Sequence, residues 1–329
     1  MRNAKIIASG MFVPDKVVTN SYFNKLLGEN VSDWLEKNVE IYERRWCNED
    51  ESTADLCVHA ANDALKNAGI HANDLNLIII STDTPEYISP STSTIVQHRI
   101  GAMNTGTFDL NSACAGFVTA LDTGAKYIRA DKKYKYIMVI GAYAMSKYLN
   151  MEDKNTVSLF ADGAAAFILK AEETEKEGFL AGNLKTQGQY CDWMGIFAGG
   201  TKYPVNQSAL DDKLNKLKFV KRFPSDLNPT MWSEMVKELC DEIEVKPKDI
   251  NHFFISQLNI RALQQTMSLL GLDMSNTPTI MHKYGYTGSA CIPMAFHLNQ
   301  KEKKINKGDL VMFVGSGGGL SFAASVFRM

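Results

Sequence analysis

A cysteine at a predicted strand–helix junction is the residue whose type and place most clearly suggest covalent chemistry. Cys114 follows the apolar run Thr107–Leu110, which predicts the end of a strand, and precedes Phe117, Leu121 and Ile128, which recur at helical spacing. A thiol at a helix N-terminus faces unpaired N–H groups and the positive end of the helix dipole, so we expect a thiolate that attacks carbonyl groups. The alternative is a small core cysteine in a tight turn.

The segments around this cysteine alternate between apolar strands and helices. The clearest helix runs over 52–69, where Ser52 is the cap residue and Gly69 ends it. The apolar segment 73–82 predicts a strand buried on both faces, and a further strand is predicted over 136–142. This alternation is typical of an α/β fold.

The second half of the chain repeats the first. Two strand-like segments recur, 73–82 as 248–257 and 134–142 as 308–316. The separations agree, because 60 residues separate Ser81 from Gly141 and 59 separate Ser256 from Gly315. Internal similarity of this kind indicates duplication. We therefore predict two α/β halves.

The boundary between the halves is predicted near residue 171. The halves are then 1–171, which carries the cysteine, and 172–329, which opens with a long irregular stretch over 172–228. We expect that stretch to cap the substrate entrance. The repeat offset also brings Ser256 and Tyr286 of the second half close to Cys114.

Composition excludes several classes of function. The chain has 329 residues, 45% of them apolar, with a net charge of -2, so nothing suggests affinity for nucleic acid. No apolar run reaches the length of a membrane span and no signal peptide is evident, so we expect a cytoplasmic protein without membrane contact. Six scattered cysteines and six histidines lack the spacing of disulfide frameworks or metal sites.

Several motifs together resemble one enzyme family. They are FDLNSACAGF, LFADGAAAFIL, QLNIR, YGYTGSA and GDLVMFVGSGGGLSF. Over nearly the whole chain they are similar to 3-oxoacyl-[acyl-carrier-protein] synthase III, also called beta-ketoacyl-ACP synthase III, a family of thiolase-fold condensing enzymes. The resemblance implies two duplicated α/β halves in a five-layer αβαβα arrangement. It also implies a homodimer.

The resemblance implies a two-step reaction at Cys114. An acyl thioester of coenzyme A or acyl carrier protein acylates the cysteine, and a second substrate, usually malonyl on acyl carrier protein, then condenses with it. The backbone N–H groups of Cys114 and Gly318 would form the oxyanion hole. Coenzyme A thioester is a substrate here, and no cofactor is expected. The products belong to fatty-acid or polyketide-like biosynthesis.

Two catalytic positions depart from the family pattern. Ser256 stands where the family has His, and Tyr286 stands where it has Asn. Loss of one such donor typically costs about 100- to 1000-fold in rate, so decarboxylation of a malonyl group is in question. His282, four residues before Tyr286, is one candidate replacement. An acceptor with an already acidic carbon would need no decarboxylation, and the alternatives are a non-condensing acyltransferase and an inactive subunit of an active paralogue.

The resemblance also assigns substrate-binding residues. Trp34 matches a residue that stacks on the adenine of coenzyme A, and Arg261 matches a basic residue at the tunnel mouth. Asn259 lies in the same QLNIR motif, and Lys154 occupies a further basic position. Ser89 aligns near a gate residue that is commonly Phe and reaches across the dimer. A small residue there favours a longer or different acyl group.

Overall fold

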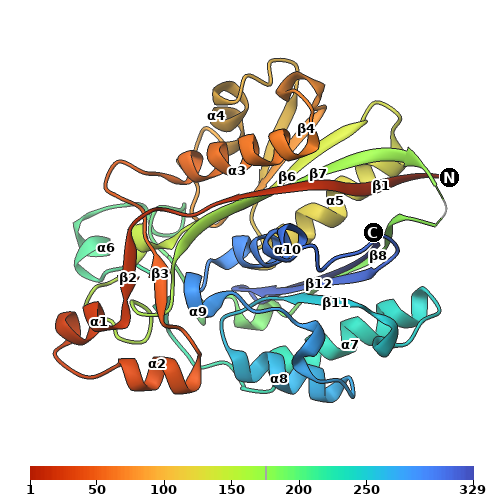
Figure 1. Ribbon diagram of the computed structural model, residues 1–329. Helices are drawn as coiled ribbons and strands as arrows, with labels where there is room; N and C mark the ends of the chain where they lie inside the picture. Colours follow the sequence, from red (N-terminus) through yellow and green to blue (C-terminus); the bar gives the residue numbers. More distant parts are fainter. Residues whose placement is uncertain (175) are drawn as a thin grey trace.

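The computed structural model describes residues 1–174 and 176–329 and contains two larger β-sheets (Figure 1). The first sheet has the order β1 (Arg2–Phe12), β7 (Asp162–Glu173), β6 (Tyr136–Ala144), β4 (Leu77–Ser81) and β5 (Gly106–Leu110). The second has the order β11 (His252–Ile255), β12 (Leu310–Gly317), β13 (Ser321–Arg328) and β8 (Gly178–Thr186). Helices separate and cover these sheets.

Five layers result from this stacking (Figure 1). The outer face of the first sheet is covered by α3 (Thr53–Ala68), and α4 (Thr92–Arg99) packs on β4 and β5. Two helices, α5 (Gly116–Ala130) and α10 (Cys291–Lys301), contact both sheets and so form the middle layer. The outer layer below is α7 (Leu227–Glu242) with α8 (Ile260–Leu269). The predicted five-layer αβαβα arrangement is confirmed.

The remaining elements lie around one end of the stack (Figure 1). They are β2 (Val17–Thr19), α1 (Asn20–Leu27), α2 (Ser32–Asn38), β3 (Glu43–Arg45), β9 (Met194–Gly195), α6 (Gln207–Asp211), β10 (Lys218–Phe219) and α9 (Met281–Tyr284). Strands β2 and β3 pair with each other, as do β9 and β10. Short 3₁₀ turns connect several of the longer elements.

Helix α3 shows how local sequence specifies an element. Ser52 and Asp55 form a reciprocal capping box at its start, and Gly69 ends it in the left-handed conformation with φ 65°. Alanines along one face are fully buried and let the helix lie close to the sheet. At Gly10 of β1, a β-carbon would come within 2.2 Å of the Ala64 nitrogen, so only glycine permits this approach.

The duplicated strands pair in equivalent registers. Strands β4 and β6 run parallel with Ser81 opposite Gly141. Strands β11 and β12 also run parallel, and the Ser256 N–H donates to Val314 O just beyond their ladder. The spacings of 60 and 59 residues read from the sequence therefore correspond to real strand pairs. The exact division at 171 and 172 stays a prediction.

Several predicted boundaries were wrong. The strand expected over 73–82 begins only at Leu77, because Ala72–Asp74 forms a 3₁₀ helix. The stretch 172–228 is not irregular throughout, because Gly178–Thr186 is strand β8 of the second sheet. Helix α5 begins at Gly116, two residues after Cys114, since the chain first makes a tight turn. The sequence also predicts one helix over 31–42, but α2 ends at Asn38, and Glu40 follows with φ 57°.

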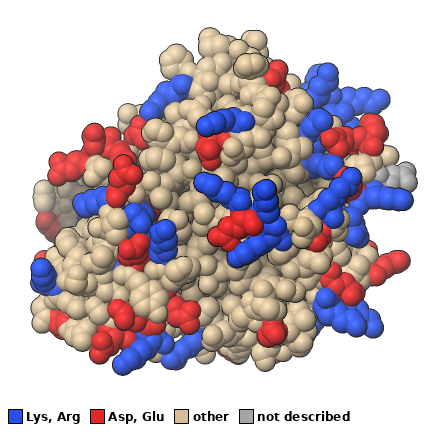
Figure 2. All heavy atoms as spheres, viewed as in Figure 1, with Lys and Arg blue, Asp and Glu red and all other residues tan. Residues whose placement is uncertain are grey.

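The surface carries no single dominant charge on the face shown in Figure 2. Lysine and arginine side chains alternate there with aspartate and glutamate, which agrees with the net charge of -2. Among the described residues, no helix is both long and apolar enough to cross a membrane.

Candidate active site

Cys114 lies in a strained turn between β5 and α5. Ala113 adopts φ 46°, a conformation that is rare for residues other than glycine, and its carbonyl accepts from the Gly116 N–H at 2.9 Å. The side chain of Cys114 is 5% exposed. The end of β12 presses on this turn, because a β-carbon on Gly317 would lie 2.5 Å from the Cys114 nitrogen. The two halves of the chain thus meet at the nucleophile.

Two residues of the second half reach the cysteine as the repeat spacing predicted. Tyr286 precedes α10, and its hydroxyl hydrogen-bonds with the sulfur of Cys114. The same hydroxyl lies 2.9 Å from Ser256 Oγ, just after β11. Both side chains are almost fully buried. Cys114, Tyr286 and Ser256 therefore form one hydrogen-bonded chain.

The expectation of a stabilised thiolate was wrong for the resting enzyme. Burial raises the pKa of Cys114 well above its ordinary value, and the charge of Asp83 raises it further. The hydrogen bond from Tyr286 acts in the opposite direction and lowers this pKa. Burial also raises the pKa of Tyr286, so its phenol stays protonated and serves as a donor. Cys114 is accordingly a neutral thiol before substrate binds.

A cavity of about 300 Å³ opens in front of the cysteine. Its wall combines the nucleophile turn, the glycine-rich end of β12 and the capping stretch; the lining residues are Asp83, Asn111, Ala113, Cys114, Met145, Cys191, Met194, Gly195, Ile196, Phe197, Leu217, Gly318 and Gly319. Gly318 and Cys114 thus line the same cavity. Five residues of the segment 191–197 line this cavity, so part of the stretch 172–228 lies beside Cys114.

Asp83 is a residue of this cavity that the sequence did not single out. It lies in the loop after β4, and its Oδ1 atom is buried without a hydrogen-bond partner in the part of the chain that the structure describes. Burial raises the pKa of its carboxyl to about 6. A single aspartate after a strand is common in turns, so only the fold shows that this one faces the nucleophile.

The residues assigned to substrate binding divide into two groups. Trp34, Asn259 and Arg261 line one separate cavity of about 300 Å³, where Arg261 Nη2 donates to Asn38 Oδ1 at 2.7 Å. Trp34 is 53% exposed. Lys154 instead pairs with Glu29 at the surface, 3.1 Å away.

The predicted gate position lies apart from both cavities. Ser89 is exposed in the loop between β4 and α4, beside Tyr87 and Ile88, which are also exposed. None of the three lines the cavity in front of Cys114.

Neither nearby histidine replaces the missing one. His252 Nε2 contacts Asp309 Oδ2 at 3.1 Å, on β11 well before Ser256. His282 lines a different cavity, together with residues that follow α8 and with Asn299 of α10. The cavity in front of Cys114 is lined by no histidine among the residues the structure describes.

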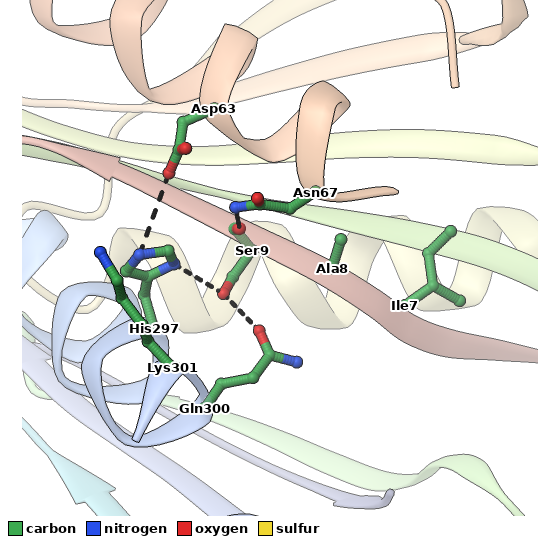
Figure 3. Close-up of a pocket in the computed structure, with 8 residues that line it drawn as sticks. All are labelled: Ile7, Ala8, Ser9, Asp63, Asn67, His297, Gln300 and Lys301. Atoms are coloured by element: carbon green, nitrogen blue, oxygen red, sulfur yellow. Dashed lines mark hydrogen bonds and ion pairs between the residues drawn. The ribbon is translucent and has the colours of Figure 1, made fainter. Parts of the chain in front are cut away.

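Another cavity brings a serine, a histidine and an aspartate together away from Cys114 (Figure 3). Ser9 Oγ lies 3.0 Å from His297 Nδ1, and His297 Nε2 lies 3.9 Å from Asp63 Oδ2. The Ser9 hydroxyl donates to Gln300 Oε1 at 2.6 Å. In its contact with His297 the Ser9 oxygen is therefore the acceptor, and the imidazole Nδ1–H is the donor. In this tautomer the imidazole does not take the proton of Ser9. The cluster links β1, α3 and α10 and is not a hydrolytic triad.

A buried cysteine that lies at the junction of two duplicated halves, is backed by glycines and lines a cavity defines an acyl-transferring enzyme of the thiolase fold. The family model for 3-oxoacyl-[acyl-carrier-protein] synthase III matches residues 108–188, and its C-terminal model matches 240–329. The beta-ketoacyl-[acyl-carrier-protein] synthase III of Clostridium perfringens is 34% identical over 332 residues, covering 100% of both chains. That of Aliarcobacter butzleri is 32% identical and covers 97% of this chain and 96% of its own.

A solved structure agrees with these sequence matches. The 3-oxoacyl-[acyl-carrier-protein] synthase III of Aquifex aeolicus has a TM-score of 0.90 at 30% identity, covering 99% of this chain and 100% of its own. The chain belongs to the 3-oxoacyl-[acyl-carrier-protein] synthase III family and is an acyltransferase of the condensing-enzyme class.

Proposed function

We propose that Cys114 captures an acyl group from an acyl thioester of coenzyme A or acyl carrier protein and passes it to the carbon of a second thioester substrate. The observation that carries this proposal is the hydrogen bond between Tyr286 and the sulfur of Cys114, a residue that lines a cavity of about 300 Å³. Backbone N–H groups of Cys114 and Gly318 are the proposed donors to the oxyanion. This arrangement suits thioester exchange followed by condensation.

The first half-reaction is an exchange between thioesters. The Cys114 sulfur attacks the acyl carbonyl carbon, and the donor's sulfur leaves as a thiolate that takes up the proton lost by Cys114. We assign the cavity at Trp34, Asn259 and Arg261 to the coenzyme A portion of the donor, since it offers an exposed aromatic face and a guanidinium.

The second half-reaction is adapted to an acceptor that needs little help with decarboxylation. Ser256 and Tyr286 supply neutral hydroxyl donors. At these two positions the family pattern has a histidine imidazole and an asparagine amide. Hydroxyls can bind the carbonyl of an acceptor thioester, although each is a poor base. We therefore propose an acceptor whose carbon is already acidic, such as a 3-oxoacyl thioester.

The wider setting follows from the same chemistry. The two half-reactions move only protons and electron pairs, so we propose no cofactor besides the thioester substrates. We also propose a homodimer that acts in the cytoplasm, where the six free thiols stay reduced. Acyl-CoA and acyl carrier protein are then its partners.

Intact-protein mass spectrometry tests acyl capture. The protein is incubated with a panel of acyl-CoAs and acyl carrier proteins, and wild type should gain one acyl mass. Cys114→Ala should gain none. Cys191→Ala is the matched control, because this exposed thiol lines the same cavity and should be dispensable. An adduct that persists on Cys114→Ala and disappears from Cys191→Ala would overturn the assignment.

A further inference from the structure

Condensation with a carbon acid requires a base that the hydroxyls of Ser256 and Tyr286 do not provide. The acceptor's C–H bond must lose its proton before or while the new carbon–carbon bond forms. Of the described residues that line the cavity, only three side chains titrate in water, namely Asp83, Cys114 and Cys191. Cys114 carries the acyl group at this stage, and Cys191 is an exposed thiol.

Asp83 has the placement that a base requires. Its carboxyl belongs to the loop directly after β4, whose last residue, Ser81, pairs with both neighbouring strands. One carboxyl oxygen, Oδ1, is buried and has no hydrogen-bond partner among the described residues. A buried oxygen without a partner is costly in an ordinary structural role, and Asp83 lies in the wall of the same cavity as Cys114.

We propose that Asp83 is the general base of the second half-reaction, removing a proton from the carbon of the acceptor thioester. The inference rests on the proposed function, because it requires an acyl group on Cys114. It also makes the reaction a non-decarboxylative condensation, in which the electron pair of a C–H bond forms the new bond.

The step balances without an added reagent. The acceptor's C–H bond breaks, its proton passes to the Asp83 carboxylate, and its electron pair attacks the acyl carbonyl carbon. The bond from that carbon to the Cys114 sulfur then breaks. The sulfur leaves as a thiolate and takes the proton back from Asp83, so both residues return to their starting states.

The groups around Asp83 favour this assignment. Its charge acts on Cys114 of the α5 turn, on Tyr143 of β6 and on Tyr148 just after β6, and raises the pKa of each. Both tyrosines stay neutral, since burial also raises their pKa values. Burial raises the pKa of Asp83 itself to about 6, which leaves a carboxylate at neutral pH that is a stronger base than an exposed one.

Asp83→Asn separates the two half-reactions. Loading of Cys114 from an acyl-CoA should be at least as fast as in wild type, because removing the charge lowers the Cys114 pKa. Discharge of the purified acyl-enzyme by acetoacetyl-CoA should fall by about 100-fold or more. Single-turnover mass spectrometry follows both rates.

In wild type the discharge rate should rise with pH through about 6 and then level, and the variant should lack this rise.

Two further variants keep the test decisive. Asp83→Glu should recover part of the discharge rate, and Asp63→Asn, the same change in a different cavity, should alter neither half-reaction. Equal loss of loading and discharge in Asp83→Asn would overturn the proposal, as would discharge at the wild-type rate. Discharge of wild type by malonyl-CoA with carbon dioxide release, but not by acetoacetyl-CoA, would also overturn it. Failure of wild type to load from any donor would instead refute the proposed function itself.

Discussion

At the scale of single residues, the site depends on how one phenol is held. The ring of Tyr286 packs against those of Phe160 and Tyr143, with centroids 5.7 and 6.4 Å away. Its hydroxyl contacts both Ser256 and Cys114. The ring packing places the hydroxyl, and the hydroxyl lowers the pKa of the thiol. Position and chemistry can therefore be separated by substitution.

Tyr286→Phe should keep the ring and remove the hydrogen bond. Because that bond lowers the Cys114 pKa, the thiol should alkylate more slowly with iodoacetamide at pH 8. Loss of one hydrogen bond worth ~1 kcal/mol corresponds to about fivefold in rate. Peptide mass mapping distinguishes Cys114 from the exposed Cys191. The control is Tyr284→Phe, two residues earlier on α9, and an unchanged rate in Tyr286→Phe would contradict the hydrogen bond's effect.

Sequence reasoning reached some of these residues and missed others for physical reasons. The repeat offset correctly predicted that Ser256 and Tyr286 lie close to Cys114, because equivalent strands of the two halves end near the same place. The thiolate expectation failed, since burial outweighs the helix dipole when the thiol lies two residues before the helix. Asp83 was missed because its importance comes from an unpartnered oxygen, a property of packing that no spacing encodes.

At the scale of elements, the end of β12 and the turn before α5 form one unit. The space between them is too small for a side chain, since a β-carbon on Gly317 would also lie 2.7 Å from Ser112 O. The glycine-rich motif was visible in the sequence. It contacts Cys114 because the two duplicated halves meet at this point. Strand β8 was missed because the stretch that contains it has many polar and glycine residues and its partner strand, β13, lies far along the chain.

Gly317→Ala should therefore disturb the fold and the nucleophile together. The added methyl meets backbone atoms, which do not move aside as a flexible side chain does, and overpacking of this kind costs about 1–3 kcal/mol. Urea unfolding measures that loss, and mass spectrometry should show slower acyl capture by Cys114. Gly188→Ala is the matched control, because no atom lies within 4 Å of its added β-carbon. Equal urea midpoints for the two variants would show that β12 leaves room for a methyl group beside the Cys114 turn.

At the scale of the whole molecule, the first sheet ends in a strand with one free side. Within residues 1–174 and 176–329, strand β5 pairs only with β4. The Gly106 N–H donates to Asn76 O, and Leu110 O accepts from the Thr82 N–H, so alternate residues of β5 face β4. Thr107 lies between them and directs its N–H outward. A free edge of this kind is a template for pairing with a second copy.

The proposed homodimer is argued from this edge. Met103, just before β5, is 67% exposed, and the loop with Tyr87 and Ile88 leaves 57% and 82% of those side chains in solvent. A second copy paired along β5 would cover apolar surface of this kind. It would also bring the loop that carries Ser89 in one copy toward the other copy. Ser89 does not line the cavity of its own chain, so it would act as a gate on the cavity of the partner copy.

Thr107→Pro tests this assembly without breaking the β4–β5 ladder. Proline removes the outward N–H and is tolerated on edge strands, so each subunit should fold while pairing across the edge is lost. Sedimentation should show wild type at twice the chain mass of 36.6 kDa and the variant at a single chain mass. Thr107→Val keeps the N–H and the β-branched shape, and should remain paired. A variant that stays dimeric would move the interface to another surface, whereas a wild type that sediments as one chain would leave Ser89 without access to any acyl group.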